Sequence, residues 1–257
     1  MNKESAGEAL FFSPKLFSLF PTLVAVESTR LGGVSSYPFA SLNLGLSTED
    51  APECVEQNRR IFFESLQIPL SEVAAAHQVH GDQILEVTHG GRWEGFDALV
   101  TATPGVFVSV TIADCTPVLV YAPRQRVVAA IHAGWRGTSL QIVKKTIQYI
   151  GEQHGVHPSD CFAYIGTCID ECAYEVGPEV AAHFEDSCRR WDPHIQKFFL
   201  NLKKANLQQL LEWGVPENQI AVSPYSTVQD NDRYFSYRKE NGQTGRMLAV
   251  IGLRQPE

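Results

Sequence analysis

The sequence predicts a single domain of the α/β (α+β) class, and three observations lead to this prediction. First, 257 residues are enough to bury a large core without help from disulfide bonds. Second, the middle third contains four short apolar or β-branched runs typical of buried strands, at 98–100, 106–112, 118–121 and 127–131. Third, segments with helical spacing of apolar residues alternate with such runs, and no repeat or linker divides the chain.

The remaining elements follow from local signals along the domain, which we expect to span 1–257. Residues 1–20 are expected to form an irregular or strand-like lead-in, and the Gly-, Ser- and Asn-rich segment 32–45 a loop. Helices are predicted over 47–71, from Thr138 or Ser139 to a stop at Gly151, over 178–188 and over 203–213. Strands are predicted over 162–165, 234–238 and 246–253, the last two around a turn at Asn241-Gly242.

Charge and hydropathy narrow the class of partner. Lys and Arg (21) against Asp and Glu (29) give a net charge of −8, the wrong sign for a protein whose main partner is nucleic acid or an anionic membrane. No stretch reaches the roughly 18 to 20 apolar residues that span a bilayer, and the N-terminus lacks the pattern of a signal peptide. We therefore expect a cytoplasmic protein whose six cysteines are free, metal-bound or catalytic rather than paired.

Three segments place a metal-binding side chain beside Gly or Pro at the edge of an apolar run. They are HQVHG, ADCTP and IHAGWRG, which contain His80, Cys115 and His132. Because residues at the C-terminal ends of strands converge on one crevice in α/β proteins, these three can meet around one ion or substrate. Their wide separation in sequence is not that of a local metal finger. Taken singly, such a histidine is more often a hydrogen-bonded residue of a loop or of the core, and such a cysteine is more often an inert buried thiol.

Other histidines and cysteines lie near these segments. His77 is close enough in sequence to reach such a site, but it fits a supporting or structural role better. Cys168 and Cys172 form a C-x3-C pair that suggests a second metal or a disulfide. No further Cys or His pair completes such a site, so we expect two free thiols.

The three segments belong to a longer series of motifs. In order, the series is TRLGGVSSYPFASLNLGL, QNRR, HQVHG, DALVT, TIADCTPVLVYAP, AAIHAGWRGT, IGTCIDECAYEVGPEV and YFSYRKENGQTGRM, which covers about 29–253. This series resembles the bacterial YfiH/laccase-domain family, also described as polyphenol oxidases and as purine nucleoside phosphorylases. The resemblance implies a layered α/β/β/α sandwich of the YfiH type, with mixed β-sheets flanked by helices.

The resemblance also implies that His80, Cys115 and His132 bind zinc, or copper in some members. The donor types agree, because two imidazoles and one thiolate leave the fourth position of a tetrahedral ion open, as in catalytic zinc sites. With Arg59, these three residues are the expected catalytic residues. A neighbouring carboxylate such as Asp114 is expected to accept a hydrogen bond from one of the histidines.

An anionic co-substrate requires local positive charge in this acidic chain. Arg59, in QNRR, and Arg136, in HAGWRG, are the expected phosphate-binding residues through charge-assisted hydrogen bonds, although Arg136 fits a structural ion pair nearly as well. Asn43, Tyr174 and Glu175 lie in family motifs. They are candidates to line a nucleoside pocket, and each fits a structural role equally well.

The resemblance implies phosphorolysis of purine nucleosides (adenosine, inosine, guanosine and methylthioadenosine) with phosphate, together with deamination of adenosine. Zinc fits deamination because it lowers the pKa of a bound water toward about 7. The H-x-E…P-C-x-x-C signature of cytidine-type deaminases is absent, so a deaminase site here would be of a different construction. For the oligomeric state we expect a monomer or a weak homodimer.

Three other functions remain open. A copper-dependent, laccase-like polyphenol oxidase needs a histidine-rich cluster, yet no two of the eight histidines are separated by one residue; a single copper ion still fits the three donors. A cysteine hydrolase would use Cys115 as nucleophile and His132 as base. A non-enzymatic binding partner would turn over no nucleoside, and no acidic or aromatic surface stripe favours it.

The chain departs from the family pattern at two places. Many members have Cys-Thr where this chain has Ser226-Thr227, which indicates that this position is not a required ligand. Many also have Pro where Thr167 stands, before Cys168. The change at Thr167 affects the Cys168 loop that follows it, so the purine preference of the family is not carried over to this chain.

Overall fold

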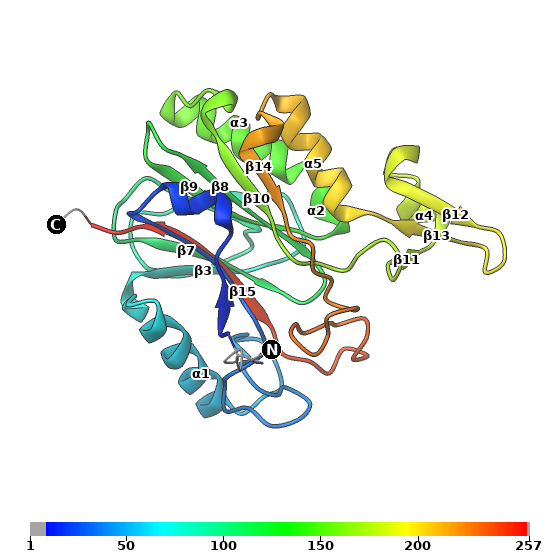
Figure 1. The fold of residues 1–257 in the computed structure, drawn as a ribbon, viewed down its shortest axis with the longest axis horizontal. Helices are drawn as coiled ribbons and strands as arrows, with labels where there is room; N and C mark the ends of the chain where they lie inside the picture. Colours follow the sequence, from blue (N-terminus) through cyan, green and yellow to red (C-terminus); the bar gives the residue numbers. More distant parts are fainter. Residues whose placement is uncertain (1–8, 256–257) are drawn as a thin grey trace, which may run out of the picture.

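Two six-stranded sheets stack face to face in the computed structural model, which describes residues 9–255, and helices cover both outer faces (Figure 1). The order of layers is α/β/β/α. This arrangement confirms the predicted mixed α/β class and the layered sandwich.

Both large sheets contain parallel and antiparallel pairs. The first sheet has the order β1-β2-β15-β7-β3-β5 and comprises β1 Phe11–Phe12, β2 Leu23–Ser28, β15 Met247–Leu253, β7 Phe107–Ile112, β3 Val73–His77 and β5 Gly91–Glu94. The second has the order β14-β10-β8-β9-β6-β4 and comprises β14 Ile220–Val222, β10 Phe162–Ile165, β8 Thr116–Ala122, β9 Val127–Ala133, β6 Ala98–Thr101 and β4 Ile84–Glu86. A small third sheet contains β11 Glu175–Val176, β13 Lys197–Leu200 and β12 Arg189–Asp192.

Four helices of the described chain pack on the outer faces of the two large sheets: α1 Pro52–Ser65, α2 Trp135–Ser139, α3 Ile142–His154 and α5 Leu202–Trp213. The short helix α4 Pro178–Ala181 packs against β13 of the small sheet. Helix α1 turns Phe62 and Phe63 against the first sheet, and α3 turns Ile147 and Ile150 against the second. Full burial of such a side chain stabilises the fold by about 1.5–3 kcal/mol relative to leaving it exposed.

The central strands are buried on both faces. Every residue of β8, β9 and β15 is buried, because the facing sheet covers one side and helices cover the other. This explains why their sequences are continuous apolar runs rather than alternating ones. The three strands form the frame on which the candidate site is built.

The strand directions bring three chain segments to one end of the sandwich. Strand β3 runs parallel to β7, so both end on the same side of the first sheet. The link 113–115 then carries the chain from β7 into β8 of the second sheet. Strand β9 is antiparallel to β8, with Pro117 opposite His132, so the end of β9 lies beside the start of β8.

Several helix boundaries in the structure differ from those predicted. The helix predicted over 47–71 begins at Pro52, a residue suited to the first helical position, and ends at Ser65. The helix predicted from Thr138 begins earlier, at Trp135, and is interrupted at Gln141, which has a left-handed φ of 63°. The second part, α3, ends at Gly155 (φ 64°) rather than at Gly151.

Two predicted elements are wrong. The helix over 178–188 stops at Ala181, whose carbonyl accepts from Phe184 N at 3.1 Å in a tighter i to i+3 turn and from Arg189 Nη1 at 2.7 Å. Residues 234–238 form no strand. Their backbone N–H groups at Ser236 and Arg238 donate to the carboxylates of Glu240 and Asp114, at 2.9 and 2.6 Å, rather than to a neighbouring strand.

The other elements are close to those predicted. Helix α5 begins after Asn201, whose side chain accepts from Lys204 N at 2.9 Å, and ends at Gly214 (φ 101°). In the predicted lead-in, β1 pairs with β2 and Lys15–Leu19 form a 3-10 helix. Residues 1–8 of that lead-in lie outside the described residues.

Candidate metal centre and cavity

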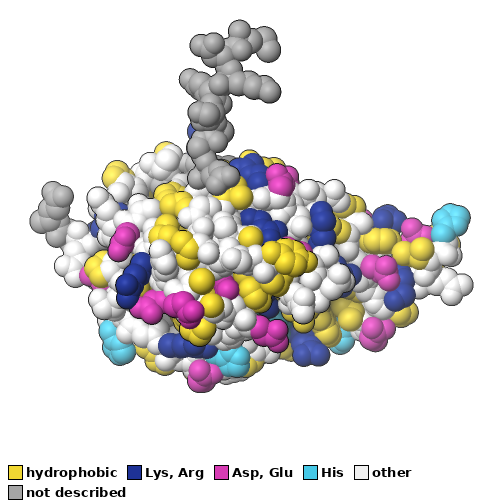
Figure 2. Space-filling model, turned by 90° about the horizontal axis from the view of Figure 1, so that it is seen from below, with side chains coloured by type: hydrophobic (Ala, Val, Ile, Leu, Met, Phe, Trp, Pro, Cys, Tyr) yellow, Lys and Arg dark blue, Asp and Glu magenta, His cyan; other side chains and the backbone are white. Residues whose placement is uncertain are grey.

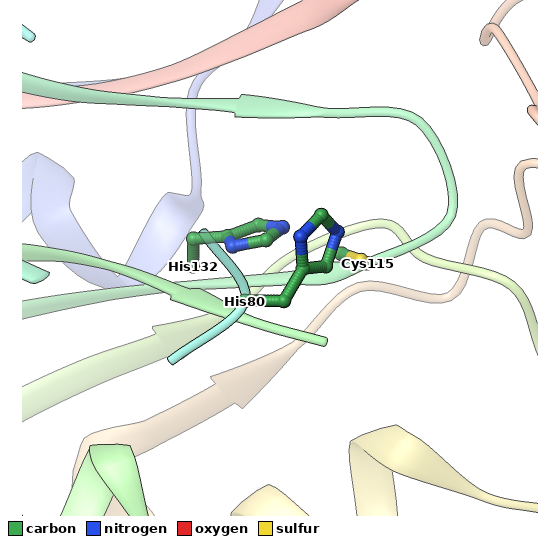
Figure 3. Close-up of side chains that lie close together, drawn as sticks. All are labelled: His80, Cys115 and His132. Carbon is green, nitrogen blue, oxygen red and sulfur yellow. The ribbon is translucent and has the colours of Figure 1, made fainter. Parts of the chain in front are cut away.

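The side chains of His80, Cys115 and His132 meet where β3, the 113–115 link and β9 end (Figure 3). One nitrogen of each histidine and the Cys115 Sγ all lie within 4.8 Å of one another. The two imidazole rings are 4.9 Å apart between centroids, at 78°. His132 is buried, Cys115 is half-buried and His80 is exposed, so the cluster has one open side.

A glycine makes room for this cluster. Gly134 follows β9, and a Cβ at this position would lie 2.9 Å from Cys115 Sγ and 3.2 Å from His80 Cδ2. The backbone φ of Gly134 is −69°, which any residue can adopt, so the need for glycine comes from this close approach. The glycine of the HAG sequence, directly after β9, therefore has a steric cause.

Asp97 holds two of the three ligand segments. Its Oδ1 lies 2.7 Å from His132 Nδ1, and its side chain is fully buried. The same carboxylate accepts hydrogen bonds from the backbone N–H groups of Val79, His80 and Gly81, at 2.8–3.2 Å. These bonds stabilise the left-handed backbone of His80 (φ 58°), which is uncommon for a residue other than glycine.

Electrostatics within the cluster favour a thiolate. Burial raises the pKa of the Cys115 thiol, but the charge and N–H groups of His132 and His80 outweigh burial and lower it to about 6. Burial lowers the pKa of His132, yet the Cys115 thiolate and Asp97 raise it to about 9. The thiolate is the form of cysteine that binds metal ions and attacks electrophiles.

The three donors fit a single transition-metal ion. Two imidazole nitrogens and a thiolate sulfur suit zinc or copper. The carboxylate on His132 Nδ1 matches the usual support of a metal-binding histidine, whose other nitrogen then faces the ion. Within residues 9–255 this is the one cluster of three such donors. The residues therefore form a candidate metal site.

Asp114 does not have the supporting role expected from the sequence. Its carboxylate accepts from Thr227 Oγ1 at 2.5 Å and from Arg238 N at 2.6 Å, and the histidine partner is Asp97 instead. Asp114 thus ties the segment that precedes β15 to the link that carries Cys115. Residue 226 lies in the same segment, and Ser226 Oγ donates to Asp170.

A cavity of about 820 Å³ opens next to the metal donors. His80, Cys115 and His132 form part of its wall, and the sequence-predicted Arg59, Arg136 and Tyr174 line it as well. The structure therefore brings six of the eight predicted site residues to one cavity.

The other two predicted residues do not line this cavity. Asn43 is fully buried, and its Oδ1 accepts from the backbone N–H groups of Gly45 and Arg246 at 3.1 and 2.9 Å. The Glu175 carboxylate is half exposed and pairs with Lys197 at 3.3 Å. Both side chains are used within the fold, Asn43 in shaping a wall segment and Glu175 in a surface ion pair.

The cavity collects positive charge. Five arginines line it, and none has a carboxylate within 4.0 Å among the described residues: Arg59, Arg92, Arg136, Arg238 and Arg246. On the face shown in Figure 2, by contrast, basic and acidic side chains are interspersed. A chain with a net charge of −8 thus has a locally basic cavity, which favours an anion.

Sequence reasoning missed several of these residues. Asp97 begins the DALVT motif, directly before the fully buried strand β6, and no local pattern marks it as the partner of His132. Arg238 and Arg246 lie in the closing YFSYRKENGQTGRM motif, and Arg92 lies on β5. His77 also lines the cavity, with Nδ1 2.8 Å from Glu94 Oε2.

Cysteines other than Cys115 take no part in the cluster. All six cysteines are free, including Cys168 and Cys172. Burial raises the pKa of Cys168 to about 12, which keeps this thiol protonated and unreactive.

Fold and site together define a layered α/β protein with a candidate three-donor metal site in a basic cavity. The family model described as "Multi-copper polyphenol oxidoreductase laccase" matches residues 24–254. The chain therefore belongs to this family, and the resemblance to the YfiH/laccase-domain proteins is confirmed.

Relatives of known name and structure agree with this assignment. "Purine nucleoside phosphorylase YlmD" of Geobacillus stearothermophilus is 37% identical over 252 residues, covering 92% of each chain. A "Purine nucleoside phosphorylase" of Deinococcus radiodurans is 40% identical over 232 residues, covering 90% of this chain and 89% of that protein. The crystal structure of the Bacillus licheniformis hypothetical protein YfiH superposes with a TM-score of 0.91 at 31% identity, covering 97% and 98% of the two chains.

Among the residues described, no helix has both the length and the apolar character needed to cross a bilayer.

Proposed function

We propose that the protein is a metal-dependent purine nucleoside phosphorylase, most simply a zinc enzyme, which converts a purine nucleoside and phosphate to the free base and ribose 1-phosphate. One observation carries the proposal: three candidate metal donors line the same cavity as five arginines that have no carboxylate partner among residues 9–255. The names of the relatives support it. Adenosine, inosine, guanosine and methylthioadenosine are the proposed substrates.

The proposed roles follow from what each side chain offers. Arg59 and Arg136 would hold phosphate through charge-assisted hydrogen bonds, with the nucleophilic oxygen toward the anomeric carbon. Tyr174 presents an aromatic ring to the cavity, with the Arg238 guanidinium 5.2 Å from the ring centre, and would contact the purine. As the glycosidic bond breaks, the bonding electrons leave with the purine, which takes up the proton of hydrogen phosphate.

His80, Cys115 and His132 would hold the ion, with Asp97 fixing the orientation of His132. A bound zinc ion supplies Lewis-acid polarisation of a substrate atom and lowers the pKa of a coordinated water. The same chemistry supports our second proposed reaction, the deamination of adenosine. Residues of this chain then have to orient the purine ring, and Tyr174 is the candidate.

The decisive experiment separates phosphorolysis from hydrolysis. Zinc-loaded protein is incubated with inosine, with and without phosphate, and hypoxanthine and ribose 1-phosphate are measured. We expect hypoxanthine only when phosphate is present, in equal amount to ribose 1-phosphate. Equal release of hypoxanthine without phosphate would replace the phosphorylase with a hydrolase.

A second candidate function is favoured by one observation. Cys115, His132 and Asp97 have the arrangement of nucleophile, base and orienting carboxylate that cysteine hydrolases use. His80 has no place in such a triad but completes a metal site. Full activity in the presence of a strong chelator would support the thiol nucleophile.

The laccase-like alternative is less well supported. Oxygen reduction by multi-copper oxidases uses a copper cluster in addition to an electron-entry copper. The described residues contain one three-donor cluster, which has room for one ion. We propose that copper at this site gives at most weak oxidation of phenols.

A further inference from the structure

Three of the five cavity arginines surround one short wall segment, Leu44 to Ser47. Arg59, on α1, donates from Nη1 to the Leu44 carbonyl at 3.2 Å. Arg92, on β5, donates from Nη2 to Ser47 Oγ at 3.2 Å. Arg246 lies just before β15, and the aliphatic part of its side chain packs against Gly45. A Cβ at residue 45 would lie 2.6 Å from Arg246 Cγ, so a larger residue would not fit there. Arg59 and Arg92 thus bring guanidinium groups to this part of the wall. Arg246 contacts it through its side-chain stem, and its Nη1 donates to the Thr244 and Gly245 carbonyls at 2.8 and 2.9 Å.

The positive charge of this cluster is not neutralised by the protein. No described carboxylate lies within 4.0 Å of Arg59, Arg92 or Arg246. The neighbouring Arg60, by contrast, pairs with Glu56 at 2.5 Å. Burial and the charge of Arg92 lower the pKa of Arg59 to about 10, and burial lowers that of Arg246. Holding like charges together costs free energy that a bound anion would offset.

Asn43 fixes the geometry of the cluster from behind. Its Oδ1 accepts from Gly45 N and Arg246 N, and its Nδ2 donates to Thr48 Oγ1 and Asp50 Oδ2, both at 2.9 Å. Oδ1 therefore joins the wall segment to the chain that carries Arg246, and the two Nδ2 bonds hold the loop around residues 43–50 in place. Asn43 does not reach the cavity, so its effect on a ligand acts through these residues.

We propose that Arg59, Arg92 and Arg246 form the phosphate subsite of the cavity and that Asn43 is its positioning residue. Guanidinium groups offer paired N–H donors that match the oxygens of phosphate. Inorganic phosphate is the ligand in the forward reaction, and the phosphate of a sugar 1-phosphate takes the same place in reverse. The inference rests on the proposed function and refines it, since it adds Arg92 and Arg246 to the arginines proposed to hold phosphate.

The test measures phosphate binding and turnover separately. Inorganic phosphate is titrated by calorimetry into zinc-loaded protein without nucleoside, for the parent and for Arg92→Gln, Arg59→Lys and Arg60→Gln. Arg92→Gln removes one charged donor, and we expect a dissociation constant about 10- to 100-fold higher. Arg59→Lys keeps the charge but loses the planar fork, so its effect should be smaller. Arg60→Gln, the matched control on the same helix, should bind phosphate like the parent.

Steady-state kinetics then locate the effect within the reaction. For Arg92→Gln we expect the KM for phosphate to rise in parallel with the dissociation constant and the KM for inosine to stay unchanged. Asn43→Ala should also raise the KM for phosphate in the folded protein. A merely structural role of Asn43 would lower the melting temperature and leave both KM values unaltered.

The outcomes separate a failure of the proposed phosphate subsite from a failure of the proposed phosphorylase function. If the parent does not bind phosphate at millimolar concentration, or if Arg92→Gln and Arg59→Lys bind it as tightly as the parent, the subsite is wrong. If phosphate binds and these variants weaken it, but inosine is not cleaved, the subsite stands and the phosphorylase proposal fails.

Discussion

Asp97 Oδ1 lies 2.7 Å from His132 Nδ1, and the same carboxylate accepts the backbone N–H of His80. One buried side chain therefore orients two residues of the candidate metal site that are far apart in sequence. Burial raises the pKa of Asp97, but the hydrogen bonds and charge of His132 and the backbone donors outweigh it, so the pKa is lowered and the carboxylate stays ionised.

Replacing Asp97 should weaken metal binding. In Asp97→Asn the acceptor for His132 Nδ1–H becomes a weaker, neutral amide, and we expect zinc affinity to fall about 10- to 100-fold. Competition with a coloured chelator measures this affinity. Asp82→Asn is the matched control, since Asp82 pairs with Lys145 outside the cluster. Equal zinc affinity of Asp97→Asn and the parent would show that Asp97 does not support the site.

A single methyl group at residue 134 should disturb the cluster without unfolding the protein. The Cβ of Gly134→Ala would lie 2.9 Å from Cys115 Sγ, so the sulfur has to move. We expect cobalt-substituted Gly134→Ala to lose most of its sulfur-to-metal charge-transfer absorption. Gly151→Ala adds the same methyl group within α3 and should keep the spectrum. A spectrum of Gly134→Ala like that of the parent would count against Cys115 as a ligand.

Removing the metal should abolish turnover of inosine and restoring it should recover the activity. Cys115→Ser should bind zinc more weakly because a hydroxyl is a poorer ligand than a thiolate. Zinc content by atomic spectroscopy, measured beside turnover, checks both statements. Retention of full activity by metal-free protein would instead favour the cysteine hydrolase, in which Cys115→Ser is inactive at any zinc content.

The raised pKa of Glu27 predicts that the stability of the protein depends on pH, independently of the candidate metal site. Burial raises its pKa above the ordinary 4.5, although Tyr164 and Thr167 hydrogen bonds oppose this. The folded protein therefore keeps a proton that the unfolded chain loses, and the free energy of unfolding falls as pH rises from 4.5 toward the raised pKa, by up to about 1.4 kcal/mol per pH unit.

Urea unfolding of metal-free protein at several pH values above and below 4.5 tests this. Glu27→Gln removes the titrating group, so its stability relative to the parent should increase as pH rises through that range. Glu64→Gln, at an exposed position of α1, should follow the parent at every pH. A constant difference between Glu27→Gln and the parent would mean that the Glu27 pKa is not raised.

The candidate metal donors were expected from the sequence, and the carboxylate that supports two of them was not. His80, Cys115 and His132 each stand at the end of an apolar run beside Gly or Pro, which is a local signal. Asp97 has no such signal, because its partners come from β9 and from the loop after β3. Asp114, the nearest carboxylate in sequence to Cys115, serves a different segment.

The segment before β15 also shows how tertiary contacts override a local preference for strand structure. Tyr234 to Arg238 have the composition of a strand, yet Asp114 and Glu240 take the backbone N–H groups that a sheet would use. The neighbouring segment, Met247 to Leu253, forms the strand as predicted, because β2 and β7 are both available to pair with it.

By itself, the sequence determined the mixed α/β class and the buried strands, since periodicity, glycine and proline act within a few residues. Its motifs, through their resemblance to a known family, also indicated the three candidate donors. The tertiary structure alone decided that Arg59, Arg92 and Arg246 meet around Leu44 to Ser47. Their charges come from α1, β5 and the start of β15, and only sheet register and helix packing bring such distant segments together.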